Sequence, residues 1–161
     1  MQDRIQRMKD EWAREYPHLD SDVMATVGAL LEAARRIEKD WLAPFAARFD
    51  LQKGELDVIA TLRRAGAPHE LTPTDLYERL LLTSSAMTSR LDRLERAGLI
   101  ERRPDPADRR GVRVRLTEQG LALIDRIVPL HVANEQAALG ALGKDECAQL
   151  ERLLSKLIGG L

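Results

Sequence analysis

The chain lacks the features that mark secreted and membrane-spanning proteins. Its 161 residues include one cysteine, Cys147, so no disulfide can form within the chain, which fits a reducing compartment. No apolar run approaches the roughly 18 residues that a membrane-spanning helix requires. The N-terminal stretch MQDRIQRMKDEWAREYP is charged throughout, so we expect no signal peptide. These absences predict a cytoplasmic protein with no membrane partner.

Motifs of metal, nucleotide and hydrolytic chemistry are also missing. His18, His69 and His131 are scattered, and the sequence contains neither HExxH nor a Cys–His cluster. It has no glycine-rich loop of the kind that binds phosphate, and no motif supports a Ser–His–Asp arrangement. We therefore expect no metal, no cofactor, no catalytic residues and no enzyme activity.

Positive charge is concentrated in one segment. The net charge of −1 argues neither for nor against a nucleic-acid partner. Residues 72–116 hold ten arginines, no lysine and seven acids, giving +3, whereas the remainder holds 15 basic and 19 acidic residues, giving −4. A basic segment inside an acidic frame is the pattern expected of a nucleic-acid-binding surface.

Apolar periodicity predicts long helices at both ends of the chain. A short amphipathic helix is expected over 3–16, and a long one over 21–49 that Pro44 is able to kink. The apolar stripe of the long helix would span roughly 40 Å, so we expect it to pack on another subunit as well as on its own core. Two more helices are expected over 118–140 and 144–158.

The middle of the chain carries strong helix-start signals. A helix is expected over 52–65, ending at the sequence AGAP. In LTPTDLYERLL, Thr72 is the expected N-cap, Pro73 the first helical residue, and Asp75 the partner that closes a capping box. This pattern predicts a second helix directly after residue 72.

A third helix and a hairpin follow. A cap at Thr83 or Ser84 opens the third helix, and Gly98 ends it in the left-handed conformation. Two short helices joined by a tight turn form a helix-turn-helix. LIERR and GVRVRL then alternate as strands do, and the polar PDPADRRG between them is the tip of a hairpin. Helix-turn-helix followed by a charged hairpin is a winged helix.

Two arginines stand where burial is expected. In SSAMTSRLDRLERAGLIERR the inner helical stripe begins at Met87 and includes Arg90 together with leucines 91 and 94. Arg102 repeats the oddity in the following strand, beside Ile100. An unpaired buried charge is strongly unfavourable, so we expect both arginines to have anionic partners.

The order of these elements and the sequence motifs themselves resemble those of a known family. LTPTDLYERLLLTSSAMTSRLDRLERAGLIERRPDPADRRGVRVRLTEQG closely resembles the DNA-binding lobe of the MarR family of bacterial repressors, and the resemblance extends from about residue 20 to 158. It implies a homodimer with interleaved terminal helices, in which each winged helix reads one half-site of a pseudo-palindromic double-stranded DNA operator. The expected parts are an extra N-terminal helix (1–17), a dimerisation helix (18–50), a winged helix-turn-helix DNA-binding domain (51–117) and C-terminal dimerisation helices (118–161).

Short hydroxyls and arginines are the expected DNA contacts. Hydroxyls near a helix N-terminus can approach bases and phosphates, and arginines on a hairpin tip suit a narrow minor groove. Solvated charges and a well-capped, solvated helix are the alternatives. The resemblance implies that Asp108 braces the wing tip while one of its two neighbouring arginines enters the groove. The expected DNA-contacting residues are Thr72, Ser84, Ser85, Thr88, Ser89, Arg93, Arg109, Arg110 and Arg113.

A narrower resemblance implies a ligand. The urate-responsive branch of the family has an extra N-terminal helix carrying a tryptophan, an aspartate in the second core helix, and two arginines. Here Trp12, Asp57, Arg90 and Arg102 fill these positions. An anionic planar ligand would compete with Asp57 for the arginines while Trp12 covers its ring, and the second core helix would move. Redox-sensing relatives carry a reactive cysteine near the start of the core, a position that Cys147 does not occupy.

Each of these four residues also has a purely structural interpretation. Trp12 continues an apolar stripe, and Asp57 can be a surface acid that shares a helix face with Arg64. Arg90 can extend its charged end to solvent from a partly buried stem. Arg102 can pair with an acid nearby in the sequence, Asp105.

The predicted fold class is mainly α with a small β-hairpin wing, that is, a winged helix-turn-helix with long terminal dimerisation helices. The predicted function is a DNA-binding transcriptional repressor that a small anionic planar ligand, urate or a related purine, releases from DNA. One alternative is a regulator of the same family that responds to an unrelated aromatic or phenolic carboxylate or to no ligand. Another is a helical interaction module without DNA binding.

Overall fold

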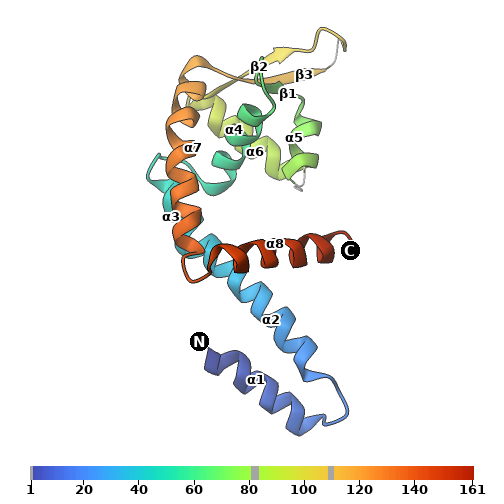
Figure 1. Ribbon diagram of the computed structural model, residues 1–161. Helices are drawn as coiled ribbons and strands as arrows, with labels where there is room; N and C mark the ends of the chain where they lie inside the picture. The colour runs from blue at the N-terminus through green and yellow to red at the C-terminus, as the bar shows by residue number, and fades with distance from the viewer. Residues whose placement is uncertain (1, 81–83, 109–110) are drawn as a thin grey trace. The chain divides into compact units, whose positions relative to one another are not determined.

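The computed structural model describes residues 2–80, 84–108 and 111–161, which divide into two compact units, Met1–Leu42 and Ala43–Leu161 (Figure 1). The first unit contains helix α1 (Gln2–Glu15), helix α2 (Ser21–Arg36) and a π-helical segment, η1 (Ile37–Leu42). Asp20 caps α2 by accepting a hydrogen bond from the backbone N–H of Asp22 at 3.0 Å. The two helices approach so closely that a Cβ on Gly28 would lie 3.2 Å from Cε of Met8.

The single helix predicted over 21–49 is instead three successive helical segments. The α-helix ends at Arg36, η1 follows, and α3 (Ala43–Ala47) completes the run. Pro44 explains the change, because it has no N–H to donate and its ring collides with the carbonyl four residues earlier. A wider π-helical stretch directly before the proline relieves that collision.

The second unit holds the predicted winged helix. Its elements agree with the sequence pattern: the helix expected over 52–65 is observed at 53–64, and the last helix is observed over 144–158 as predicted. The mainly helical fold class with a small antiparallel sheet is confirmed. After α3, the elements are α4 (Lys53–Arg64), β1 (Glu70–Leu71), α5 (Pro73–Leu80), α6 (Ser84–Arg96), β2 (Ile100–Pro104), β3 (Val112–Leu116), α7 (Glu118–Ala138) and α8 (Lys144–Ile158).

One hydrophobic core joins helices α3 to α7 of this unit to its sheet. Helix α4 contacts α5, α6 and α7, and the β2–β3 hairpin extends beyond the helices that cover the sheet (Figure 1). Met87, Leu91 and Leu94 are buried, so the predicted inner stripe of α6 faces the core. The other largest fully buried side chains are Val58, Ile59, Thr61, Leu62, Leu76, Ile100, Val114, Ile124 and Ile127.

The sheet has one strand more than the sequence predicted. Its order is β1-β3-β2, all antiparallel, with Arg102 opposite Val114 and Glu70 opposite Arg115. Strand β1 is two residues long, too short for alternation to reveal it. It exists because β3 offers a free edge, and Leu71 lies opposite Val114 there.

The predicted caps of the helix-turn-helix are confirmed where the structure describes them. Thr72 and Asp75 form the reciprocal box: Asp75 N donates to Thr72 Oγ1 at 3.1 Å, and Thr72 N donates to Asp75 Oδ2 at 3.1 Å. Gly98 has a φ of 70° and ends α6 in a Schellman motif, with Leu99 N donating to the carbonyl of Leu94 at 3.0 Å. Of the two cap positions predicted for α6, Thr83 lies outside the described residues and Ser84 is the first residue of the helix.

Candidate nucleic-acid interface and ligand site

Helix α6 separates an apolar inner face from a polar outer face. Its inner face is fixed by the three buried residues of the core stripe, and Thr88 and Ser89 are exposed on the other side. Ser84 and Ser85 begin the helix, and their side chains lie outside the described part of the chain. The helix therefore offers hydroxyl groups outward from its N-terminal half, as the sequence predicted.

The wing is braced by an aspartate that sequence reasoning did not select. The Asp105 carboxylate accepts hydrogen bonds from the backbone N–H of Ala107 at 2.9 Å and from Nε of Arg113 at 3.0 Å. These donors, the Ala107 N–H first, hold the pKa of Asp105 below its usual range. The backbone carbonyl of Asp108, the residue that the resemblance implies as the brace, accepts a hydrogen bond from Gly111 N at 2.9 Å, and the bracing role of its side chain stays a prediction.

The predicted wing contacts to DNA divide into two groups. Arg109 and Arg110 lie outside the described residues. Arg113 also approaches Glu70 of β1 at 3.7 Å, so its charge links the hairpin to the first strand of the sheet. Its contact with DNA stays a prediction.

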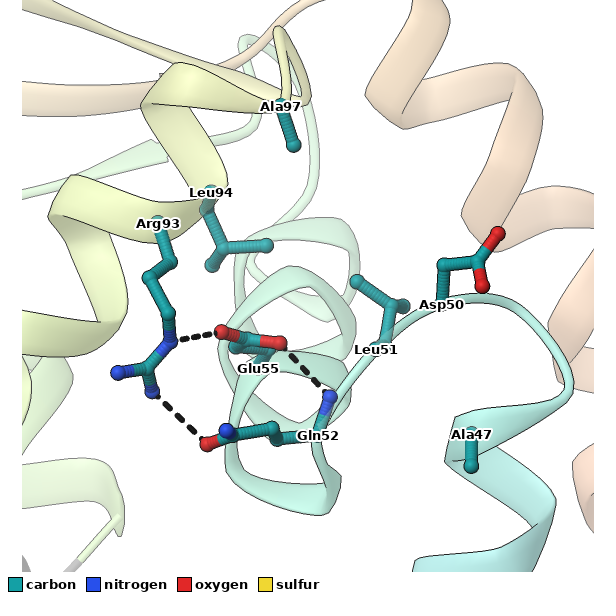
Figure 2. Close-up of a pocket in the computed structure, with 8 residues that line it drawn as sticks. All are labelled: Ala47, Asp50, Leu51, Gln52, Glu55, Arg93, Leu94 and Ala97. Carbon is teal, nitrogen blue, oxygen red and sulfur yellow. Dashed lines mark hydrogen bonds and ion pairs between the residues drawn. The ribbon is translucent and has the colours of Figure 1, made fainter.

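Arg93, predicted to contact DNA, is bound within the protein. Figure 2 shows its guanidinium between α6 and the first turn of α4, at the edge of a pocket of about 380 Å³. Nε donates to the carboxylate of Glu55, Nη2 donates to Oε1 of Gln52 at 2.9 Å, and Nη1 donates to Oγ of Ser89 at 2.9 Å. Glu55 is only 5% exposed, and its other oxygen accepts the backbone N–H of Gln52 at 2.7 Å. We call Gln52, Glu55, Ser89 and Arg93 the Glu55 cluster.

Arg90 lies against the same turn of α4. A Cβ on Gly54 would be 2.5 Å from Nε and 2.6 Å from Nη1 of Arg90, so the guanidinium occupies the space that any larger residue would need. Asp57 follows Gly54 by three residues and thus lies on the same helix face. Asp57 itself pairs with Lys53 at 3.0 Å. The structure therefore brings Arg90 to the turn that carries Asp57, but the ion pair of Asp57 is with a lysine four residues away.

Arg102 points from β2 toward α6, on the same side of the strand as buried Ile100. Its Nη2 donates to Oδ1 of Asp92 at 2.6 Å and its Nη1 to Oε2 of Glu95 at 2.5 Å. Burial lowers the pKa of Arg102, but these two carboxylates outweigh burial and raise that pKa. The alternative pairing with Asp105 is wrong, because the described Asp105 carboxylate binds Arg113 and Ala107 instead.

Trp12 belongs to the first unit, on α1. Its ring lies 5.6 Å from the ring of Tyr16, centroid to centroid, and the residue is 38% exposed. The sequence missed the acids that hold the arginines, Glu55, Asp92 and Glu95. Asp92 and Glu95 are three residues apart and so share one face of α6, which the helical spacing shows, but no sequence signal connects Arg93 to Glu55.

Other kinds of site find no support in the part of the chain that the structure describes. No group of three His, Cys, Asp or Glu side chains there could hold a metal ion. None of the helices over those residues combines the length and the apolar character needed to cross a membrane.

Comparison with known proteins gives one consistent result. A model of the MarR family matches residues 49–111. The chain is 39% identical over 147 residues to the HTH-type transcriptional regulator PecS of Dickeya dadantii, covering 91% of this chain and 88% of PecS. It is 26% identical over 147 residues to the HTH-type transcriptional repressor YetL of Bacillus subtilis, covering 91% of this chain and 87% of YetL.

Solved structures extend the match to the fold. A mutant of MarR from E. coli complexed with operator DNA is similar with a TM-score of 0.74 and 29% identity, covering 91% of this chain and 96% of that one. The related fold in that crystal is bound to DNA.

Proposed function

Because the chain belongs to the MarR family of winged-helix regulators, it is a DNA-binding transcriptional regulator and not an enzyme, and we propose that it is a repressor released from DNA by a small anionic planar ligand. The observation that carries the proposal is helix α6. Its inner stripe fixes it to the core, its outer face presents hydroxyls, and the β2–β3 hairpin follows it directly. Repression is supported by the name of YetL, a repressor of similar length.

The DNA contacts follow from this arrangement. The hydroxyls of Thr88 and Ser89, with the serines that open α6, would meet base edges and phosphates in the major groove. Arg109 or Arg110 would reach the adjacent minor groove, with Arg113 near the loop of the hairpin. Each arginine that meets a phosphate contributes to salt dependence, so binding should weaken steeply as salt rises.

A homodimer is supported by apolar surface that the chain does not bury by itself. Helix α8 has no buried residue, and Leu153, Leu157 and Ile158 are 58%, 47% and 70% exposed. In the other unit, α2 exposes Val27 and Leu31. Monomers rarely expose apolar patches of this kind, and a dimer would present two α6 helices to successive major grooves of a pseudo-palindrome.

The ligand proposal is supported by the charge of Arg90. No carboxylate among the described residues forms an ion pair with it, although Arg90 is half-buried and its guanidinium lies against Gly54. A planar anion is the partner that a guanidinium fork binds best. Urate or a related purine bound there would meet Asp57 one turn further along α4, and the repulsion would move α4 and, through Arg90, the recognition helix. From the resemblance to the urate-responsive branch we also give Trp12 the role of covering the ring. Arg102 would supply a second positive charge by exchanging Asp92 or Glu95 for the ligand.

Fluorescence anisotropy tests both parts of the proposal. The labelled duplex would come from upstream of the protein's own gene, with a scrambled duplex of equal length as the control. Tight, salt-sensitive binding to the first duplex only, reversed by urate but not by benzoate, is the expected result. Equal, weak binding to both duplexes would contradict sequence-specific regulation. Tight binding that urate leaves unchanged would support DNA regulation but contradict the ligand site. Purely structural roles would then be assigned to Trp12, Asp57, Arg90 and Arg102.

A further inference from the structure

We propose that Glu55 is a positioning residue for DNA recognition. Through its bond to Arg93, Glu55 fixes the orientation of α6 relative to the first turn of α4. The inference rests on the proposed DNA binding, and it assigns the Arg93 guanidinium to Glu55 rather than to a phosphate. Neither residue would touch a base. Their effect would appear in how well α6 fits a specific sequence.

The geometry of the Glu55 cluster carries the argument. Glu55 is the third residue of α4, and its carboxylate accepts both the Gln52 N–H and Nε of Arg93. The same guanidinium donates to the Gln52 side chain at 2.9 Å (Figure 2). One arginine from α6 therefore binds two residues of the α4 N-terminus, and its planar fork defines an orientation as well as a distance.

Burial makes this contact obligatory. Glu55 is 5% exposed, with the apolar side chains of Leu51 and Leu94 lining the pocket beside it. A carboxylate that loses its cation in such a place keeps a desolvated charge, which is far worse than losing a surface ion pair. The side chain of Arg93 is 35% exposed, so water could solvate its charge if it left Glu55. The buried Glu55 carboxylate has no such alternative, and it holds Arg93 in place.

The bonds of Arg93 argue against a phosphate contact. Each of its three guanidinium nitrogens already donates to a protein oxygen, on Glu55, Gln52 and Ser89. Nη1 and Nη2 each keep one further N–H, but a contact that turned the whole group toward DNA would break these bonds and leave the Glu55 carboxylate uncompensated. Arg96, three residues later on α6, is exposed and reaches only the backbone carbonyl of Asp92 at 3.1 Å, which makes it the matched control.

The test compares Glu55→Gln, Arg93→Gln, the double variant and Arg96→Gln in the full-length protein. Anisotropy with the upstream and scrambled duplexes at several salt concentrations gives affinity and the slope of log K against log salt. We expect E55Q and R93Q each to lose roughly tenfold for the upstream duplex, and the double variant to lose no more than the worse single one, because the two residues act as one unit. The salt slope and the scrambled-duplex affinity should match those of wild type.

A different pattern would overturn the inference. If Arg93 contacts a phosphate, R93Q lowers the slope by about 0.9 while E55Q binds like wild type. Should E55Q fail to fold, the comparison of R93Q with R96Q decides alone. A wild-type salt slope in R93Q, together with a lost preference for the upstream duplex, supports positioning. A lowered salt slope in R93Q refutes it.

Amide hydrogen exchange tests the contact without DNA. Faster exchange in α6 is expected for E55Q and R93Q and not for R96Q, and equal protection in all three would overturn the inference. A wild-type protein without sequence preference would refute the proposed function, and the exchange data would still decide the role of Glu55.

Discussion

Replacing Gly54 with alanine should separate ligand response from folding and DNA binding. The added methyl carbon would lie 2.5 Å from Nε of Arg90, and ordinary van der Waals contact begins at 3.4 Å, so the guanidinium must move by the difference, 0.9 Å, or more. Gly54 has no positive φ, so its backbone accepts alanine. The clashing atoms are the end of a flexible side chain, which can swing aside cheaply.

The energies predict opposite effects on stability and on ligand binding. Alanine in a helix is favoured over glycine by up to about 1 kcal/mol, which would raise the melting temperature by about 3 °C in a protein of this size. A hydrogen bond to a charged group contributes about 1.5–3 kcal/mol, so a displaced Arg90 should weaken urate binding by about ten- to a hundredfold.

Thermal melts and the anisotropy assay check this prediction. G54A should melt at or above the wild-type temperature and bind the upstream duplex within about twofold, the size of an ordinary surface substitution. The urate concentration that releases DNA should rise. Arg90→Lys, which keeps the charge and loses the planar fork, should share the ligand defect. A G54A protein with wild-type urate response would refute the placement of the ligand at Arg90.

Three further variants test the remaining parts of the site. Asp57→Asn should lower the urate response and leave DNA affinity nearly intact. Since the ion pair of Asp57 with Lys53 is partly exposed, the substitution should cost at most about 0.5 kcal/mol of stability. An undiminished urate response would exclude competition between the ligand and the Asp57 carboxylate. Thr72→Ala should cost about 1 kcal/mol at neutral pH in thermal melts, as the loss of an N-cap does. Hydrogen bonds from Thr72, its side chain first, hold the pKa of Asp75 below its usual range. Their stabilisation is therefore present above about pH 4 and fades as pH falls through the folded-state pKa. The difference in unfolding free energy between T72A and wild type should narrow in acid, and a constant difference would contradict the pairing. Asp105→Asn should weaken binding to the upstream duplex with unchanged circular dichroism, and Asp108→Asn serves as its comparison: a larger loss in D108N would return the bracing role to that residue.

Local patterns predicted most of the helices and the hairpin. Capping boxes, the Gly98 terminator and the alternation after it act over three to five residues, so they are legible in the sequence. The π-helical segment before Pro44 was outside that reach, because the proline signals a disturbance without specifying its geometry. Strand β1 was missed for a related reason: it pairs with a strand more than forty residues away.

The sequence by itself determined that Arg90 and Arg102 lie on inward-facing stripes, and for Arg102 that it would need acids; among the described residues no carboxylate pairs with Arg90. The sequence did not determine which acids. For Arg102 the sequence offered Asp105, three residues away, whereas the fold gives it Asp92 and Glu95 across the gap between β2 and α6. Successive side chains of a strand point to opposite faces of the sheet, so a position three residues away points away from Arg102. The acids on α6 lie on the face to which Arg102 points.

The same distinction separates Arg93 from its sequence interpretation. An arginine on the polar side of a recognition helix reads as a DNA contact, because sequence reports residue type and helix face. Its partner Glu55 is 38 residues earlier. Periodicity and caps depend on neighbouring residues and so are written in the sequence; the pairing of charges depends on which helix ends meet, and only the packed tertiary structure decides that.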